Sequence, residues 1–301
     1  MKILVIGKNG QIGWELQRTL APLGNVIALD RADLDLTDQD AIRSRVREIQ
    51  PELIVNAAAY TAVDQAESEP EVAYSINATA PGVLAEEARA LSAWLLHYST
   101  DYVFDGAKSG PYEENDCVNP LSVYGASKLA GEQAIAATGG RYLILRTSWV
   151  YGARGKNFLL TIMRLARERE ELRVVADQVG SPTWSRMVAE ATAQIAIQLL
   201  SAPRRSRQEA GIYHLTCAGE TSWYDFAREI VKWMTSSSVT AWSARCPDGP
   251  RLVPIPTSEY PRPARRPANS CLACAKLHTD FRITLPPWSV ALSLCFDDLL
   301  E

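Results

Sequence analysis

The first half of the chain alternates short apolar segments with stretches of helical spacing, and this alternation restricts the fold more than any other feature. Apolar segments start at Ile3, Val26, Leu53, Trp94 and Tyr142. Short apolar strands separated by helices are typical of a parallel sheet whose crossover helices cover both faces. We therefore expect an α/β fold with a doubly wound parallel sheet. We also expect Thr37 to cap the second helix.

The pattern becomes less regular after Trp149, and the 301 residues exceed one average core. We expect a sheet domain over residues 1–150 and a smaller lobe over 151–301, with some segments of the second part returning to the first. Five prolines between Val253 and Pro267 exclude regular helix and central strand there. That stretch should be an extended, ordered segment over a site, or else a linker. Residues 201–210 should form a solvated loop.

The composition is that of an ordinary folded protein. Hydrophobic residues make up 47% of the chain and charged residues 22%, with a net charge of −4. These values exclude global disorder and argue against nucleic acid or an anionic membrane as the main partner. No apolar run approaches the ~20 residues of a membrane helix, and the first apolar run is too short for a secretory signal. We expect a cytoplasmic protein.

The chain has six cysteines, which we expect to be reduced thiols in the cytoplasm. Cys271 and Cys274 have the CxxC spacing seen in zinc and redox sites. A zinc site needs four ligands, and neither a second CxxC nor a His pair lies nearby in the sequence. We interpret the pair as structural.

A glycine-rich turn follows the first strand, with Gly7, Gly10 and Gly13 in the spacing GxxGxxG. Glycine permits a positive φ and lets backbone N–H groups approach a pyrophosphate at the start of the next helix. Asp30 ends the second strand, where a carboxylate binds adenosine ribose hydroxyls, and Arg31 beside it can pair with a 2′-phosphate. The sequence predicts a Rossmann-type dinucleotide site and leaves both NADH and NADPH open.

Tyr124 and Lys128 lie four residues apart, on one face of an expected helix. The preceding strand ends in Thr100, at the edge where ligands of such sheets bind. A phenol has a pKa of about 10, and a nearby ammonium lowers that pKa by stabilising the phenolate. A threonine hydroxyl can hydrogen-bond a carbonyl oxygen. These residues suit hydride transfer between nicotinamide and a carbonyl or alcohol, with Tyr124 as proton donor or acceptor.

These features resemble the extended short-chain dehydrogenase/reductase superfamily, and longer strings are similar to the dTDP-4-dehydrorhamnose reductase family within it. The strings are Gly10–Leu16, Asn56–Asp64, His97–Phe104, Arg146–Tyr151 and Pro263–Pro267. The resemblance runs nearly end to end. It implies an NAD(P)-binding domain over 1–150, a nucleotide-sugar lobe over most of 151–301, and reduction of the C4 keto group of dTDP-4-dehydro-β-L-rhamnose to dTDP-L-rhamnose with NADPH or NADH.

The resemblance also implies roles for individual residues. With the turn included, the cofactor-binding residues would be Gly7, Gly10, Gln11, Ile12, Gly13, Asp30, Arg31, Asp35, Leu36, Ala59, Tyr60, Thr61, Tyr98, Tyr124 and Lys128. Among them, Tyr98 would lie under the cofactor and Lys128 would hold the nicotinamide ribose.

The substrate-binding residues would be Thr100, Asp101, Trp149, Arg265 and Arg266. An indole face suits the apolar surface of a deoxysugar, and guanidinium groups pair bidentately with a diphosphate. Asn157 and Gln178 are further candidates for contact with the nucleotide.

The resemblance leaves open a homodimer and a Mg²⁺ requirement, with Glu15 as a ligand at a dimer contact. The sequence offers no carboxylate cluster for a complete Mg²⁺ site. We therefore expect no metal at the catalytic centre and keep Glu15 as the single candidate ligand.

Two other functions stay open. A nucleotide-sugar 4-epimerase or 4,6-dehydratase would belong to the same superfamily. A resemblance to the dehydratases would imply the sequence Thr-Asp-Glu at this strand end, whereas Tyr102 follows Asp101 here. A non-catalytic NADP-binding regulatory subunit would not need a proton donor, so the intact set of Thr100, Tyr124 and Lys128 favours an enzyme.

Overall fold

The computed structural model describes residues 1–201, 210–236 and 249–300. Cys246 and nearly all of the loop expected at 201–210 lie outside these ranges. Among the helices of the described ranges, none has both the length and the apolar character needed to cross a bilayer.

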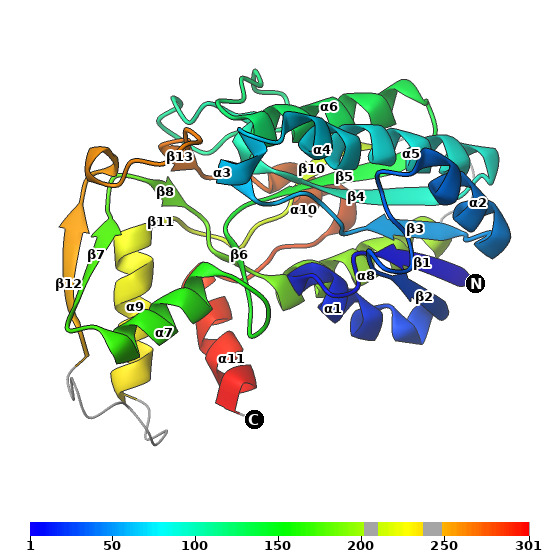
Figure 1. Ribbon diagram of the computed structural model, residues 1–301. Helices are drawn as coiled ribbons and strands as arrows, with labels where there is room; N and C mark the ends of the chain where they lie inside the picture. The colour runs from blue at the N-terminus through cyan, green and yellow to red at the C-terminus, as the bar shows by residue number, and fades with distance from the viewer. Residues whose placement is uncertain (202–209, 237–248, 301) are drawn as a thin grey trace.

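A six-stranded parallel sheet forms the centre of the molecule (Figure 1). In spatial order, its strands are β2 (Asn25–Leu29), β1 (Lys2–Ile6), β3 (Leu53–Asn56), β4 (Trp94–Thr100), β5 (Arg141–Thr147) and β10 (Gly211–His214). All neighbours pair in parallel, which confirms the doubly wound α/β fold. The strand order reverses at β1, so the carboxyl ends of β1 and β3 mark the place where such sheets bind ligands.

Helices cover both faces of the sheet because successive strand residues point in opposite directions. Leu4 and Ile54 belong to one buried core, and Ile3 and Val55 belong to another. Figure 1 shows α2, α5 and α6 on one side and α1 and α8 on the other. These helices are α1 (Gln11–Thr19), α2 (Gln39–Ile49), α5 (Ala80–Ala90), α6 (Val123–Ala137) and α8 (Ser185–Ser201). Burial on both faces explains the nearly continuous apolar strands.

Short helical segments connect several of these elements. Between β3 and α5 the chain forms α3 (Val63–Ala66), α4 (Pro70–Tyr74) and a π-helical turn at Ser75–Thr79. Turns of 3-10 helix lie at Ala21–Leu23, Asp101–Val103 and Thr257–Glu259.

The second part of the chain forms small sheets and also returns to the central one. The small sheets pair β7 (Glu171–Val175) with β12 (Arg251–Ile255), β6 (Val150–Tyr151) with β9 (Thr183–Trp184), and β8 (Val179–Gly180) with both β11 (Thr221–Ser222) and β13 (Asn269–Ser270). The remaining helices are α7 (Phe158–Glu168), α9 (Trp223–Ser236), α10 (Ala275–Phe281) and α11 (Trp288–Leu300). The returning segments are β10, which pairs with β5, and α8, which packs against α1.

The proline-rich stretch begins in a strand and continues through the 3-10 turn at Thr257–Glu259 into an irregular loop. Pro254 lies within β12, in a two-stranded sheet with β7. A strand with a partner on one side tolerates a residue that cannot donate, so this proline fits.

The predicted cap of the second helix was wrong by one residue. Asp38 caps α2, because its carboxylate accepts a hydrogen bond from the Ala41 N–H at 2.9 Å. The Thr37 hydroxyl instead donates to Asp35 at 2.9 Å. Both residue types are good caps, so the sequence alone did not separate these neighbours.

Gly131 on α6 lies directly against the π-helical turn. An added Cβ would be 2.1 Å from the carbonyl oxygen of Asn77. We expect Gly131→Ala to lower the free energy of unfolding by about 1–3 kcal/mol, measured by urea denaturation, because the new methyl group forces two backbones apart. Gly110→Ala is the control, since an added Cβ there meets nothing within 4 Å. Equal stability of the two variants would contradict the close contact.

Candidate active site

The glycine turn is packed so closely that larger residues do not fit. Gly7 has a φ of +91°, and a Cβ there would lie 2.7 Å from the backbone nitrogen of Ala58, in the loop after β3. A Cβ on Gly13 would lie 2.0 Å from the carbonyl oxygen of Gly7. Gly10 precedes α1 and has no side chain to cap the helix, which leaves its first N–H groups suited to an anion. The turn thus has the close backbone approach that a pyrophosphate needs.

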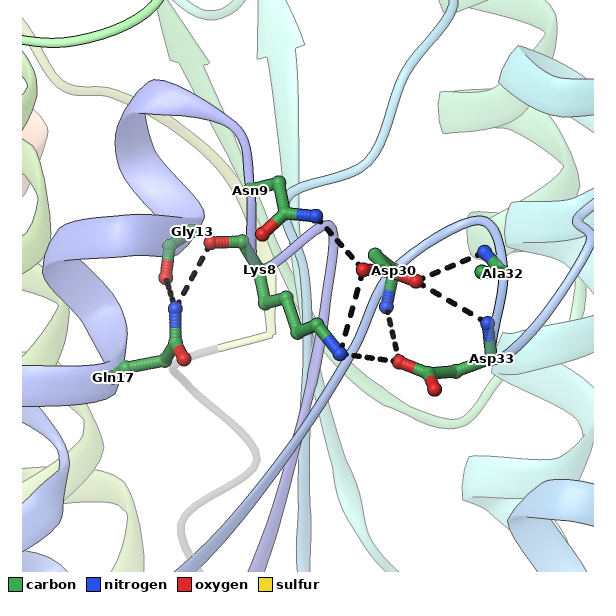
Figure 2. Close-up of polar contacts among 7 residues, drawn as sticks. All are labelled: Lys8, Asn9, Gly13, Gln17, Asp30, Ala32 and Asp33. Atoms are coloured by element: carbon green, nitrogen blue, oxygen red, sulfur yellow. Dashed lines mark hydrogen bonds and ion pairs between the residues drawn. The ribbon is translucent and has the colours of Figure 1, made fainter.

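A charged cluster holds Asp30 at the end of β2, beside the turn (Figure 2). The Asn9 amide donates to the Asp30 carboxylate at 2.8 Å, and Lys8 Nζ lies 3.4 Å from the same oxygen. Lys8 also pairs with Asp33, which raises the pKa of Lys8 and lowers that of Asp33. No sequence pattern indicated Lys8, Asn9 and Asp33 as site residues. The expected parallel sheet could have suggested them, because residues that follow neighbouring strands share one edge.

Arg31, predicted to pair with a 2′-phosphate, directly follows Asp30. It is exposed, and its charge adds to the low pKa of Asp35, which is set first by the hydrogen bond from the Thr37 N–H. Leu36 is buried. Lys8 is therefore a cation in direct contact with Asp30, while Arg31 faces Asp35.

Asn77 connects the loop after β3 to helix α6 through hydrogen bonds. This loop includes Ala59, Tyr60 and Thr61. The Tyr60 N–H donates to Asn77 Oδ1 at 2.9 Å, and Asn77 Nδ2 donates to the Tyr60 carbonyl oxygen at 3.1 Å and to Ser127 Oγ at 3.0 Å. Asn77 belongs to the π-helical turn, a feature that often marks functional sites. No sequence pattern had pointed to it.

Thr100, Tyr124 and Lys128 come together at the carboxyl end of β4, as predicted for a catalytic group. Ser122 caps α6 by accepting a hydrogen bond from the Gly125 N–H at 3.2 Å, which places Tyr124 in the first turn. Thr100 lies close enough to the Tyr124 hydroxyl to affect its pKa, and the Thr100 hydroxyl itself donates to Asp101 Oδ1 at 3.0 Å. Burial raises the pKa of Tyr124 to about 12. The phenol is therefore protonated at neutral pH, the form that can donate a proton.

Lys128 is buried, with 2% of its surface exposed. Its Nζ donates to the Tyr98 carbonyl oxygen at 2.6 Å and lies 3.1 Å from His97 Nε2. Burial lowers the pKa of Lys128 to about 8, while Glu132 acts in the opposite direction. Glu132 itself forms a buried bidentate pair with Arg146, at 2.9 and 2.6 Å.

Tyr98 contributes its carbonyl group to this edge of the sheet. Its side chain points toward α8, where the hydroxyl lies 2.6 Å from Thr192 Oγ1. The ring, expected under the cofactor, is packed in the core on the α1 and α8 side of the sheet.

Asp101 and Trp149 both contact residues from the second half of the chain. Asp101 is buried, and burial raises its pKa to about 6 against hydrogen bonds from Ser270 and Thr100. Trp149 stacks on Trp223, with ring centroids 3.4 Å apart and an interplanar angle of 7°. The indole is thus held in a fixed plane by an aromatic partner that the sequence did not suggest.

A cavity of about 640 Å³ lies beside Tyr102, the neighbour of Tyr124. Tyr102 lines it and packs edge-on against Tyr124, with ring centroids 5.7 Å apart. The lining also includes Phe158, Gln178, Trp223, Arg262, Arg265 and Arg266. The sequence had indicated Gln178, Arg265 and Arg266 as contacts of the substrate. No pattern had indicated the other members, Tyr102, Phe158, Trp223 and Arg262.

The two predicted arginines differ in how they are held. Arg266 forms a bidentate pair with Asp64 at 2.9 and 3.0 Å, and this pair keeps the pKa of Asp64 low. Arg265 is exposed. Asn157, a further nucleotide candidate, instead caps α7 and donates to Gln11 of the glycine turn at 2.9 Å. Arg266 is therefore prepositioned, while Arg265 is free to reorient.

Within the described ranges, no group of three or more His, Cys, Asp or Glu side chains is arranged to hold a metal ion. Glu15 lies near the charges of Arg186 and Asp298, and burial raises its pKa. A Mg²⁺ site at Glu15 therefore has no support. Cys271 lies 3.6 Å from Glu220 and Cys274 lies 3.4 Å from Thr216, and both thiols are unbridged with raised pKa values.

Comparisons with known proteins agree along the whole chain. A family model described as RmlD substrate binding domain matches residues 1–301. A dTDP-4-dehydrorhamnose reductase from Burkholderia thailandensis is 50% identical and covers 100% of both chains. One from Escherichia coli K12 is 45% identical, over 99% of this chain and 98% of that protein.

Solved structures lead to the same family. The dTDP-4-dehydrorhamnose reductase of Bacillus anthracis, in complex with NADP, has a TM-score of 0.87 and 35% identity over 99% of both chains. The Clostridium acetobutylicum enzyme has a TM-score of 0.88 and 39% identity over 100% of both chains. A Thermus thermophilus UDP-glucose 4-epimerase reaches 0.79 at 21% identity, which shows a shared fold alone. The chain belongs to the dTDP-4-dehydrorhamnose reductase family.

Proposed function

We propose that this protein reduces the C4 keto group of dTDP-4-dehydro-β-L-rhamnose to give dTDP-L-rhamnose, with NADPH or NADH as hydride donor. The position of Tyr124 carries the proposal. Its hydroxyl lies near Thr100, and its ring packs against Tyr102, which lines a cavity with four arginines, Arg173, Arg262, Arg265 and Arg266. Guanidinium groups and aromatic walls suit a nucleotide diphosphate joined to a deoxysugar. The relatives named dTDP-4-dehydrorhamnose reductase, one of them in complex with NADP, support this choice.

The carboxyl edge of the sheet fits a dinucleotide. The contacts of Gly7 with Ala58 and of Gly13 with Gly7 leave no room for side chains, so the backbone itself would meet a pyrophosphate at Gly10, Gln11 and Ile12. Asp30 would hold the adenosine ribose and Lys128 the nicotinamide ribose. When bound there, the reduced cofactor supplies the hydride.

The residues around Tyr124 would handle the proton. Tyr124 donates its proton to the C4 oxygen, and Thr100 stabilises the charge that develops on that oxygen by hydrogen bonding. A charged Lys128 stabilises the phenolate that remains on Tyr124. Trp149, held against Trp223, would pack on the apolar face of the sugar.

Product analysis tests the proposed reaction against the alternatives. The purified protein is incubated with the 4-keto nucleotide sugar and either NADPH or NADH, and the products are identified by NMR. A reductase consumes one reduced cofactor per sugar, whereas an epimerase or dehydratase consumes none and a regulatory subunit gives no turnover. A cytoplasmic location, a homodimer and the division at residue 150 stay predictions.

Tyr124→Phe should lower kcat by roughly 10²–10⁴-fold, because it removes the general acid. Cofactor affinity should change little, since the ring remains in place. Tyr102→Phe is the matched control, because it removes a neighbouring phenol hydroxyl and should keep most of kcat. Steady-state kinetics decides, and nearly normal turnover in Tyr124→Phe would remove this residue from the mechanism.

NADH and NADPH should both serve, within about tenfold in kcat/KM, or ~1.4 kcal/mol. Lys8→Met should weaken NADPH selectively, because it leaves the carboxylates of Asp30 and Asp33 facing the 2′-phosphate without their cation. Arg31→Met, which faces Asp35, should have the smaller effect. Fluorescence titration gives Kd for both cofactors. Equal weakening of NADH and NADPH in Lys8→Met would show that Lys8 only stabilises the turn.

Replacing an arginine that binds the diphosphate should weaken dTDP binding by about 1.5–3 kcal/mol, the range for hydrogen bonds to charged groups. Arg265→Ala and Arg266→Ala are titrated with dTDP by calorimetry. Arg266→Ala should also reduce stability, because Asp64 loses its partner. Arg164→Ala, which breaks an exposed pair with Glu168 on α7, is the control. If both cavity variants bind dTDP as tightly as the parent, the diphosphate binds elsewhere.

A further inference from the structure

Asn56, His97 and Lys128 form a buried row of polar side chains that the proposed mechanism does not explain. They come from β3, β4 and α6, and 0%, 1% and 2% of their surfaces are exposed. Asn56 Nδ2 lies 3.1 Å from His97 Nδ1, and His97 Nε2 lies 3.1 Å from Lys128 Nζ. The imidazole is thus held at both of its nitrogens.

The His97 ring is neutral. Burial keeps its pKa well below the ordinary value, and a charged Lys128 would lower it further. A neutral imidazole has one N–H, so one nitrogen donates and the other accepts. The neighbours decide which tautomer is present.

The backbone of Ala58 sets the direction of the hydrogen bonds. Its N–H can only donate, and it donates to Asn56 Oδ1 at 3.2 Å. The Asn56 amide nitrogen therefore faces the ring and donates to His97 Nδ1. His97 then carries its proton on Nε2, which faces Lys128. Nζ can accept that hydrogen bond as a neutral amine while it still donates to the Tyr98 carbonyl oxygen at 2.6 Å.

A charged Lys128 requires the opposite arrangement. An ammonium has no lone pair, so His97 Nε2 must accept and Nδ1 must carry the proton. Asn56 must then turn its amide so that the oxygen faces the ring. The turned amide presents its NH₂ group to the Ala58 N–H, and that hydrogen bond is lost. The charge on Lys128 and the hydrogen bond at Ala58 therefore exclude each other.

This network reaches the proposed cofactor site at both ends. Ala58 lies against Gly7 in the glycine turn, and Lys128 lies one helical turn from Tyr124. The charged group that acts on Lys128 is already engaged. It is Glu132 on α6, which is paired with Arg146 of β5. The pKa of Lys128, lowered to about 8 by burial, allows either charge state near neutral pH.

We propose that His97 is a positioning residue that favours the neutral amine of Lys128 in the cofactor-free protein, and that cofactor binding brings one proton from solvent onto Lys128. The new N–H bond forms at Nζ, the His97 proton moves from Nε2 to Nδ1, and Asn56 releases the Ala58 N–H beside the glycine turn. The proposal rests on the proposed function, because it requires a cofactor to bind next to Lys128.

The test measures proton uptake when NADH binds. NADH is used because it lacks the 2′-phosphate, which titrates by itself. Calorimetry at pH 8 in HEPES and in Tris, whose ionisation enthalpies differ, gives the number of protons taken up. A pKa of about 8 leaves about half of Lys128 neutral at pH 8, so we expect the parent protein to take up about half of one proton and Lys128→Met to take up none. Binding without uptake in the parent would overturn the proposal, whereas failure to bind both NADH and NADPH would refute the proposed function.

Two substitutions of His97 separate positioning from burial. Glutamine reaches the place of Nε2 and should preserve proton uptake, whereas asparagine reaches only the place of Nδ1 and should lose most of it. Circular dichroism melting curves check that both variants are folded. If His97→Asn takes up as many protons as the parent, burial alone controls Lys128, and the role of His97 is wrong.

Discussion

β1 lies between β2 and β3, and the contacts of the candidate site follow from this order. The turn after β1 meets the loop after β3 at Gly7 and Ala58, and it meets the end of β2 through Lys8 and Asp30. β4 is the next strand outward, so Thr100 reaches the same edge. A parallel sheet collects the carboxyl ends of its strands at one edge, which is why residues so far apart in the sequence share one site.

The burial of Lys128 links the chemistry to this edge. A lysine in water would be charged and would move freely, but this one is held between a backbone carbonyl and a neutral imidazole. Burial removes water from Lys128 and thereby lowers its pKa to about 8. Such a group can respond to a bound molecule by changing its charge, which an exposed lysine at its ordinary pKa cannot do.

The sequence allowed the strand ends to be predicted, because glycine spacing and apolar runs report local backbone needs. Gly7, Asp30, Thr100 and the pair Tyr124 and Lys128 all lie at the edge that the pattern indicated. These residues are fixed by their own elements, so periodicity was sufficient to place them.

Partners across the fold could not be predicted in this way. The pairing of Arg266 with Asp64 joins residues 202 positions apart, and Trp149 stacks on a residue of α9. Asn77 acts from a π-helical turn, a backbone irregularity with no clear signature in the sequence. The first two contacts depend on how the second half of the chain packs against the sheet domain, and local patterns carry no information about that packing.

The most direct test of the site is the fate of the transferred hydrogen. The protein is supplied with NADPH that carries deuterium at the transferable C4 position of the nicotinamide, together with the 4-keto nucleotide sugar. We expect one deuterium at C4 of the sugar for each cofactor oxidised, because Tyr124 and the cofactor would act on the same carbonyl. Deuterium that stays in the cofactor, or product formed without it, would contradict direct reduction at this site.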